Sequence, residues 1–309
     1  MLTQGFFYLA DKSPAVRRLI FRILFEYLAR YYYGLISWTQ MNYGYASDGG
    51  NGHTIPLDAV QESERYCHQL YHHLTLGLDL AGMDVLEVSS GRGGGAVFLH
   101  RLCNTRTMTG VDIAHAAVAF CNRTHAAPGL RFVQGDAEAL PLPSESFDAV
   151  VNVEASFCYA STDRFLAEVY RVLRPGGYFL YTDLRLTREV AALRDALARS
   201  RLDLMSENNI TANVVRALQL DAARRAGLDG QGVSRWLRHA MRTFAGAPGT
   251  RIPTLLARDD MRYLSFVLRK PGAAAPIPAA DAKRNAESST VPSYDGPEIA
   301  LAGSKAFAT

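Results

Sequence analysis

Apolar and polar positions follow two different periods in the middle of the chain. Five short apolar runs of strand length begin near Asp84, Met108, Arg131, Phe147 and Gly177, and segments of helical length separate them. Strands that alternate with helices imply right-handed crossovers and a parallel sheet with helices on both faces. Two later runs, "LDLMSENNIT" and "MRYLSFVLRK", add a weak sixth strand and a last strand. The pattern therefore predicts an α/β fold: a doubly wound, mostly parallel seven-stranded sheet with an antiparallel last strand.

The N-terminal segment has a different pattern. A serine and a proline at 13–14 predict the start of a helix, and the stretch that follows, "AVRRLIFRILFEYLARYYYGLISW", is mostly aliphatic and aromatic. Such a helix packs on its own domain, covers an apolar substrate as a lid, or rests on a membrane surface, and the sequence leaves these three readings open. Its five charges argue against a membrane-spanning helix. Its narrow polar stripe consists of Arg18, Arg22, Glu26 and Arg30.

We divide the chain into three parts. Residues 1–56 are expected to form an N-terminal helical lid and a turn-rich loop. Residues 57–270 form the α/β domain, in which helical segments at about 186–260 cap the sheet. Residues 271–309 are rich in alanine, proline and serine with little apolar periodicity, so a disordered tail is expected there.

Composition narrows the class of protein. With 48% hydrophobic and 20% charged residues, a chain of 309 residues is typical of a globular protein with a sizeable core. The net charge of +3 and the lack of a basic run do not favour nucleic acid as a partner. Four widely spaced cysteines without a C-x-x-C pair indicate reduced thiols, and no signal peptide or membrane-spanning run is recognised, so a cytoplasmic location is expected.

The run "DVLEVSSGRGGGAVFL" passes from the first strand into a helix through glycines. A glycine loop at the carboxyl end of a parallel strand lets a nucleotide approach the backbone, and the following helix offers free N–H groups. Gly91, Gly93 and Ala96 fit the dinucleotide fingerprint in its G-x-G-x-x-A form. By itself, the loop suits either a pyrophosphate or the carboxylate of an amino acid.

Acidic residues at three successive strand ends distinguish between these ligands. A carboxylate at Glu87 would repel a pyrophosphate but attract an ammonium or sulfonium group. Asp112, 21 residues after Gly91, can accept hydrogen bonds from both ribose hydroxyls, and Asp136 with Ala137 can meet the adenine edge. An adenosine joined to a cationic amino acid fits all three positions, and S-adenosylmethionine is such a molecule.

Four segments carry a resemblance to a known family: "VLEVSSGRGGG", "GVDI", "FVQGDAEALPLPSESFDAVVNVEAS" and "AEVYRVLRPGGYF", which lie within about residues 84–183. On them the chain resembles the class I S-adenosylmethionine-dependent methyltransferases, which have a Rossmann-like fold. Within the class it is most similar to phthiotriolone and phenolphthiotriolone dimycocerosate methyltransferases and related O-methyltransferases that tailor polyketides and lipids. One departure is Ser89, which stands where the family usually has the first glycine of its loop.

The resemblance implies S-adenosylmethionine as the cofactor and assigns residues to its parts. In this assignment, Glu87, Ser89, Gly91 and Gly93 line the methionine part, Asp112 and Ile113 hold the ribose, Asp136 and Ala137 hold the adenine, and Asn152, Val153 and Glu154 lie under the sulfonium.

Transfer of a methyl group to a hydroxyl needs a base within hydrogen-bond reach of that hydroxyl. Candidate catalytic bases are Glu154 after the fourth strand, Asp183 after the fifth, and His72 on the helix before the sheet. Tyr43 and Tyr45, in the loop "NYGY", are candidates to close over the cofactor and contact the substrate. His72 also lies four residues after His68, but two histidines without a positioned third ligand do not make a metal site, so no metal is expected.

The substrate is expected to be a hydrophobic small molecule, because the lid helix and the segment 186–260 must cover the active edge of the sheet. We therefore predict methyl transfer to a hydroxyl of a polyketide or lipid-like secondary metabolite. The alternatives are carbon methylation of a quinone or terpenoid, a methyltransferase-fold cyclase that transfers no methyl group, a non-enzymatic S-adenosylmethionine-binding protein, and a nicotinamide oxidoreductase. The sequence does not settle the oligomeric state. The apolar side chains that these two segments contribute include Phe25, Tyr31, Trp38, Trp236, Met241 and Phe244.

Overall fold

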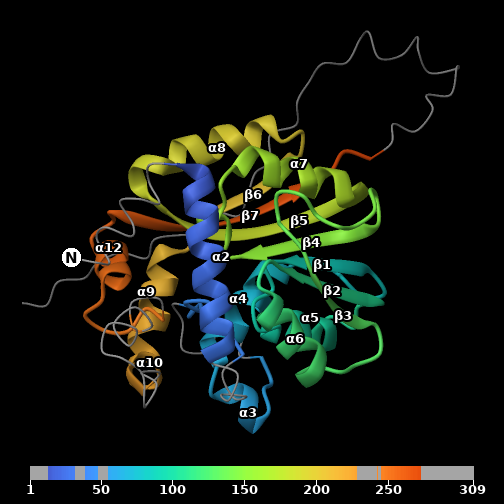
Figure 1. The fold of residues 1–309 in the computed structure, drawn as a ribbon. Coiled ribbons are helices and arrows are strands. Elements are labelled where there is room, and N and C mark those ends of the chain that lie inside the picture. Colours follow the sequence, from blue (N-terminus) through green and yellow to red (C-terminus); the bar gives the residue numbers. More distant parts are fainter. Residues whose placement is uncertain (1–12, 32–38, 48–54, 228–241, 243–244, 273–309) are drawn as a thin grey trace, which may run out of the picture. The chain divides into compact units, whose positions relative to one another are not determined.

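Seven strands form one sheet in the order β3-β2-β1-β4-β5-β7-β6 (Figure 1). Strands β1 to β5 pair in parallel, whereas β7 is antiparallel to both of its neighbours, β5 and β6. This arrangement confirms the predicted fold class, including the weak sixth strand and the antiparallel last one. The strands are Asp84–Val88 (β1), Thr107–Asp112 (β2), Leu130–Gln134 (β3), Phe147–Val153 (β4), Leu173–Leu186 (β5), Asp203–Asn209 (β6) and Met261–Arg269 (β7).

The computed structural model describes residues 13–31, 39–47, 55–227, 242 and 245–272. The expected tail beyond 272 and four of the predicted substrate-facing residues, Trp38, Trp236, Met241 and Phe244, lie outside these ranges. The longer helices are Pro14–Tyr31 (α2), Arg65–Thr75 (α4), Gly94–Leu102 (α5), His115–Thr124 (α6), Thr162–Val172 (α7), Val190–Arg199 (α8) and Thr211–Leu220 (α9). Shorter helices are Ala59–Glu62 (α3), Ala222–Gly227 (α10) and Arg251–Ala257 (α12), with single turns at Ser156–Cys158 (η2) and Thr187–Glu189 (η3).

Helices cover both faces of the sheet because successive strand residues point to opposite faces. On β5, Leu180 packs into a core cluster with side chains of α4, α5 and α9. Its neighbours Phe179 and Tyr181 pack into a second cluster with side chains of α7 and α8. Figure 1 shows α7 and α8 on one side of the sheet and α4, α5 and α6 on the other. Strands β1, β2, β4, β5 and β7 contribute side chains to both clusters, as expected for the inner strands of a doubly wound sheet.

Two segments with a continuous helical pattern in the sequence are each divided into two helices in the structure. The segment 57–78 forms α3 and α4, and the Glu64 carboxylate at the break accepts hydrogen bonds from the N–H groups of Thr39 and Gln40, each 3.1 Å from Oε1. The segment 212–226 forms α9 and α10, with Asp221 between them; its Oδ2 lies 2.9 Å from Nε of the buried Arg225. In both cases, a polar side chain at the break is used for a tertiary contact that local periodicity does not reveal.

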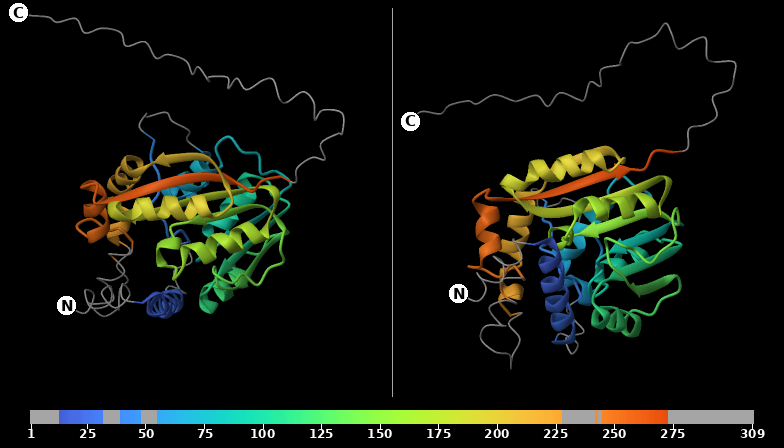
Figure 2. Two further views of the ribbon diagram at one scale, coloured as in Figure 1. Left: turned by 90° about the horizontal axis from the view of Figure 1, so that it is seen from above. Right: turned by 45° about the horizontal axis from the view of Figure 1, so that its top comes forward.

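The N-terminal helix α2 begins at the predicted proline and contacts α6 and η2. Figure 2 shows it running beside α6, outside the two helical layers. The turn η2 follows β4, and α6 begins just after β2, so α2 lies near the edge at which these strands end. No helix in the described part of the chain is both long and apolar enough to cross a membrane.

Candidate functional site

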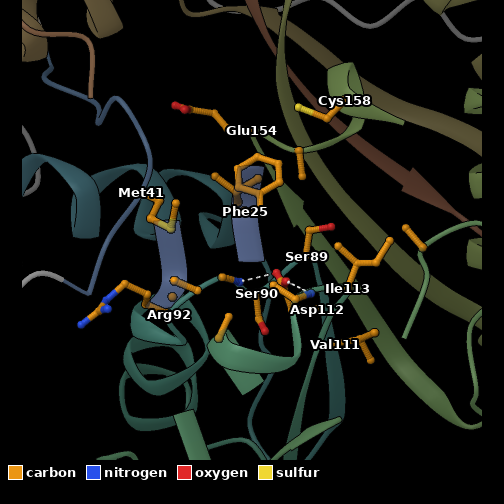
Figure 3. A pocket seen from close by; sticks show the side chains of 18 of the residues that line it. Phe25, Met41, Ser89, Ser90, Arg92, Val111, Asp112, Ile113, Glu154 and Cys158 are labelled. Carbon is orange, nitrogen blue, oxygen red and sulfur yellow. Dashed lines mark hydrogen bonds between the residues drawn. The ribbon is translucent and has the colours of Figure 1, made fainter. Parts of the chain in front are cut away.

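A pocket opens where β1, β2, β3 and β4 end, the edge at which open α/β sheets bind ligands. The loops after these strands form one wall, and α2 with residues 39–42 forms another. Figure 3 shows Phe25, Met41, Glu154 and Cys158 around one end of the pocket and Ser89, Asp112 and Ile113 around the other. The predicted site residues in the lining are Ser89, Gly91, Asp112, Ile113, Asp136, Ala137, Val153 and Glu154.

The glycines of the loop after β1 have two roles, lining the pocket and allowing close packing of α5. Gly91 lines the pocket, with φ of 53°. Gly93, with φ of 79°, is the residue before α5, and a Cβ there would come within 2.8 Å of the Phe132 ring. A Cβ on Gly95 would lie 2.1 Å from the Tyr71 hydroxyl oxygen. Gly93 and Gly95 therefore let α5 pack closely against its neighbours, while Gly91 leaves room on the pocket side.

Asp112 joins the first two loops of the pocket. Its Oδ2 accepts the N–H of Gly91 at 2.8 Å, and its Oδ1 accepts the N–H of Ala114 at the same distance. Burial raises the pKa of this carboxyl, and the two backbone hydrogen bonds oppose that shift. Each carboxylate oxygen has a second lone pair, so Asp112 can hold the loops and still accept hydrogen bonds from a ligand's hydroxyl groups.

Replacing Asp112 with alanine should weaken S-adenosylmethionine binding. Loss of two charge-assisted hydrogen bonds corresponds to about 2–4 kcal/mol, or about 30- to 1000-fold in Kd. Calorimetric titration measures this directly. The matched control is Asp195→Ala, which removes an exposed aspartate on α8, outside the pocket lining, and should leave Kd unchanged. Unchanged affinity in the Asp112 variant would show that the ribose lies elsewhere.

Near the end of β1, Glu87 has a buried carboxyl group whose two oxygens differ in their hydrogen bonding. Its Oε1 accepts the Tyr71 hydroxyl at 2.6 Å, and its carboxyl also accepts the N–H of Ala96. Among the described residues, Oε2 has no hydrogen-bond partner. Burial raises the pKa of Glu87 to about 8. A cationic ligand group nearby would favour the ionised form and offset the cost of burying it.

These observations test whether the site fits S-adenosylmethionine. The unpartnered acceptor on Glu87 suits an ammonium or sulfonium group, and the Asp112 carboxylate suits ribose hydroxyls. The buried Oδ1 of Asn152 and Oγ of Ser90 are also unpartnered among the described residues. Carboxylates at the polar end of the pocket, with buried acceptors in and directly behind its lining, fit an adenosine joined to a cationic amino acid better than they fit a pyrophosphate.

The loop after β3 supplies the end of the pocket assigned to adenine. Asp136 accepts the N–H of Glu138 at 3.0 Å on its Oδ1, and Ala137 is buried beside it. Glu138 was not predicted, yet it lines the pocket; its Oε1 accepts the N–H groups of Ala160 and Ser161, at 2.7 and 3.2 Å. Glu138 thus connects two loops that are far apart in the sequence. Its position two residues after Asp136 is the sequence signal by which it could have been found.

Ser89 and Asn152 meet at the hydroxyl of Tyr159, a second residue that sequence reasoning missed. Ser89, with φ of 61°, has its Oγ 2.6 Å from the Tyr159 Oη, and Asn152 donates from Nδ2 to the same oxygen at 2.9 Å. Asn152 Nδ2 also donates to the carbonyl of Val88 at 2.9 Å. The serine that departs from the family pattern is therefore held by a specific partner, and Tyr159 itself lines the pocket.

Replacing Tyr159 with phenylalanine should weaken cofactor binding about tenfold, because it removes a hydroxyl that satisfies two polar groups at the loop. The double variant Tyr159→Phe/Ser89→Gly should recover part of the lost affinity, since it also removes the serine hydroxyl that the first substitution leaves without its tyrosine partner. A double-mutant cycle on Kd should give a coupling of at least about 0.5 kcal/mol. The control is Tyr170→Phe, because this tyrosine on α7 is not in the pocket lining and its hydroxyl accepts a hydrogen bond from Arg201. If the effects of the two substitutions on the binding free energy are strictly additive, the Ser89–Tyr159 contact does not help to order the loop.

Glu154 lines the pocket directly after β4, with φ of 49°. Its Oε1 accepts the N–H of Tyr43 and the hydroxyl of Tyr263, both at 2.5 Å. Burial raises the pKa of Glu154 to about 8, although both hydrogen bonds favour the ionised form. A pocket carboxyl with a pKa near the working pH has the property required of a general base.

Four predicted residues are not part of the pocket lining. Tyr43 is buried in the core, and the Tyr45 ring stacks on His73 with centroids 4.3 Å apart; Met41 and Asn42 of the same segment reach the pocket instead. His72 is half-buried on α4. Asp183 is fully buried, with its Oδ2 2.9 Å from the Arg185 guanidinium.

Three further predicted cofactor residues, Glu87, Gly93 and Asn152, lie behind the pocket lining and support the loop. His68 packs against Phe98, and burial lowers its pKa to about 4. Within the described ranges, no three histidine, cysteine, aspartate or glutamate side chains are grouped so that they could hold a metal ion.

Comparison with known proteins places these features in a family. A family model described as a methyltransferase domain matches residues 86–181. Phthiotriol/phenolphthiotriol dimycocerosates methyltransferase from Mycobacterium tuberculosis is 44% identical over 216 residues, which are 70% of this chain and 80% of that protein. Fatty-acid O-methyltransferase from Mycolicibacterium smegmatis is 48% identical over 184 residues, which are 59% of this chain and 66% of that protein.

Among solved structures, the 4+2 cyclase SpnF superposes with a TM-score of 0.65 and covers 83% of this chain and 97% of its own. At 18% sequence identity, this likeness concerns the fold alone.

Proposed function

The chain belongs to the S-adenosylmethionine-dependent methyltransferases, and from this membership we propose that it transfers the methyl group to a hydroxyl of a hydrophobic, lipid-like molecule. Two relatives that are more than 40% identical are named for phthiotriol dimycocerosates and for fatty acids. Both names describe lipid-like substrates, and they support the same substrate class for this chain.

The pocket itself supports an apolar acceptor. The end away from Asp112 has Phe25, Met41 and Cys158 in its lining, with Glu154 beside them. Polar acceptors gather instead at the end formed by Asp112 and the glycine loop. The cofactor therefore has a polar end of the pocket to occupy, and a hydrophobic substrate has an apolar one.

When bound, S-adenosylmethionine supplies a methyl group that its sulfonium has already activated. The protein must hold the acceptor hydroxyl in line with that group, remove its proton and exclude water. We assign the proton removal to Glu154: the hydroxyl proton passes to its carboxylate as the oxygen takes the methyl group. One observation carries this assignment: the Glu154 carboxyl lines the pocket beside its apolar end. Burial there also raises the pKa of Glu154 to about 8, which suits a base.

The neighbours of Glu154 position it for this role. The hydrogen bonds from the Tyr43 N–H and the Tyr263 hydroxyl both end on Oε1, so Oε2 is the oxygen that would take the proton. Tyr43 thus contributes through its backbone rather than by closing over the cofactor. The partner in this proposal is a hydrophobic small molecule.

Two measurements test the proposal. Titration with S-adenosylmethionine, S-adenosylhomocysteine and NAD should show saturable binding of both adenosyl ligands and none of NAD. Incubation with long-chain alcohols and hydroxylated lipids should give products heavier by one CH₂ unit, with the new methyl group on oxygen by NMR. A methyl group on carbon would replace the proposal with carbon methylation, and a product of unchanged mass would indicate a cyclase.

A further inference from the structure

The N-terminal helix α2 has two faces, and the first is part of the site. Phe25 and Ala29 line the pocket, and they pack against Ala114 and Ala117 at the beginning of α6. Glu26 accepts the N–H of Ala116 at 3.2 Å, which ties α2 to the loop that Asp112 organises. This inner face fixes α2 over the pocket.

The second face points away from the pocket and is apolar. It consists of Val16, Leu19, Ile23 and Tyr27, which are 39, 57, 61 and 49% exposed. Spacings of three, four and four residues place these side chains in one stripe along the helix. Single exposed apolar residues need no explanation, but a continuous stripe of four marks a surface that contacts something apolar.

Charge indicates what that partner is. The helix sequence holds four arginines and one glutamate, a net charge of +3, which equals that of the whole chain. The one glutamate of this sequence, Glu26, already pairs with an arginine of the same helix, since its Oε1 accepts a hydrogen bond from Arg30 at 3.0 Å. A second copy of the helix would bring like charges together, whereas an anionic lipid surface offers both an apolar layer and negative charge.

We propose that the outer face of α2 docks the enzyme on an anionic lipid surface, from which the substrate enters the pocket beneath the same helix. The inference rests on the proposed function for the substrate class, but docking itself needs no catalysis. The apolar stripe enters the boundary between headgroups and acyl chains, and the net positive charge of the helix sequence favours anionic headgroups. A basic amphipathic helix of this kind lies in the membrane plane and does not span it.

Co-sedimentation of the full chain with vesicles tests the docking without any methyl acceptor. The chain should bind vesicles of phosphatidylcholine mixed with phosphatidylglycerol, should not bind phosphatidylcholine alone, and should dissociate as salt is raised. The double variant Leu19→Glu/Ile23→Glu should bind at least about tenfold more weakly, because it removes two buried apolar side chains and adds like charge.

The matched control is Leu204→Glu/Met205→Glu, which adds the same charges at side chains 53 and 56% exposed on β6, away from α2. It should bind vesicles like the unaltered chain. Calorimetry with S-adenosylhomocysteine checks that each variant still binds the cofactor product in its pocket. If the glutamate substitutions detach α2 from the pocket, the uncharged double variant Leu19→Gln/Ile23→Gln is used in their place.

Three outcomes overturn docking on an anionic lipid surface: no binding to either vesicle, equal binding by the stripe variant and the control, or a dimer that the stripe variant dissociates while vesicle binding is unchanged. A chain that binds vesicles through this stripe yet methylates no hydroxylated lipid would keep the docking and refute the proposed substrate.

Discussion

Replacing Glu154 with glutamine is expected to lower kcat for hydroxyl methylation by about 100-fold or more, the usual contribution of a positioned general base. Glutamine has nearly the same shape and can still accept hydrogen bonds from the Tyr43 N–H and the Tyr263 hydroxyl. Cofactor affinity should therefore change little, while proton removal is lost. Steady-state kinetics and calorimetry with S-adenosylhomocysteine separate these two effects.

The pH profile gives the same hypothesis a second test. A base must be ionised to accept a proton, and burial raises the pKa of Glu154 to about 8. The rate of the unaltered enzyme should therefore rise as pH increases through about 8 and level off above it. The residual rate of the glutamine variant should not show this rise.

Tyr263→Phe is the matched control for the role of Glu154. The tyrosine hydroxyl donates to Glu154 Oε1 and lowers the pKa of the carboxyl, so its loss should raise that pKa. The rise in rate should then move to higher pH, with the plateau still reached. A glutamine variant with kcat within about threefold of the unaltered enzyme, or a profile that Tyr263→Phe does not move, would remove Glu154 as the base.

The sheet and the cofactor end of the pocket follow from sequence because they depend on local signals. Alternating strand and helix lengths define the parallel order, and carboxylates at successive strand ends then meet at one edge. Asp112 and Asp136 could be predicted in this way, since each lies at or just after the end of its own strand. The glycine loop was also recognisable, although Gly93 serves packing against Phe132 rather than the pocket, and Gly95 both lines the pocket and packs closely against Tyr71.

The remaining parts of the site depend on contacts between segments far apart in the chain. Tyr159 reaches Ser89 across 70 residues, and Tyr263 reaches Glu154 across 109. No period or motif encodes such pairs. The segment 39–42 lies against the pocket because Glu64 holds its backbone from the start of α4, which again is a tertiary contact.

Asp183 shows where a strand-end carboxylate misleads. The sequence places it after the fifth strand, like the predicted cofactor-binding aspartates, but β5 continues to Leu186 and therefore contains Asp183. Arg185 follows two residues later on the same face of the strand. In the structure both side chains are buried, and their charged atoms lie 2.9 Å apart. This internal ion pair, which the sequence analysis did not predict, gives Asp183 a structural role.

Replacing Asp183 with alanine should accordingly destabilise the fold by about 3–5 kcal/mol, because it leaves the Arg185 guanidinium buried without its counter-ion. Asp183 Oδ2 also accepts the Ser156 hydroxyl at 2.5 Å and the Phe157 N–H at 3.0 Å, so the turn η2 loses its anchor. Urea unfolding measured by circular dichroism gives the free energy of unfolding directly.

The double variant Asp183→Leu/Arg185→Met provides the matched control, because removing both charges leaves neither one stranded. It should recover at least half of the lost stability, as apolar replacements of buried ion pairs commonly do. Asp183→Asn distinguishes this role from catalysis, since it keeps the shape of the side chain and removes only its charge. An asparagine variant of normal stability that loses kcat and the rise in rate near pH 8 would transfer the role of base from Glu154 to Asp183, and the buried pair would then be part of the chemistry rather than of the core.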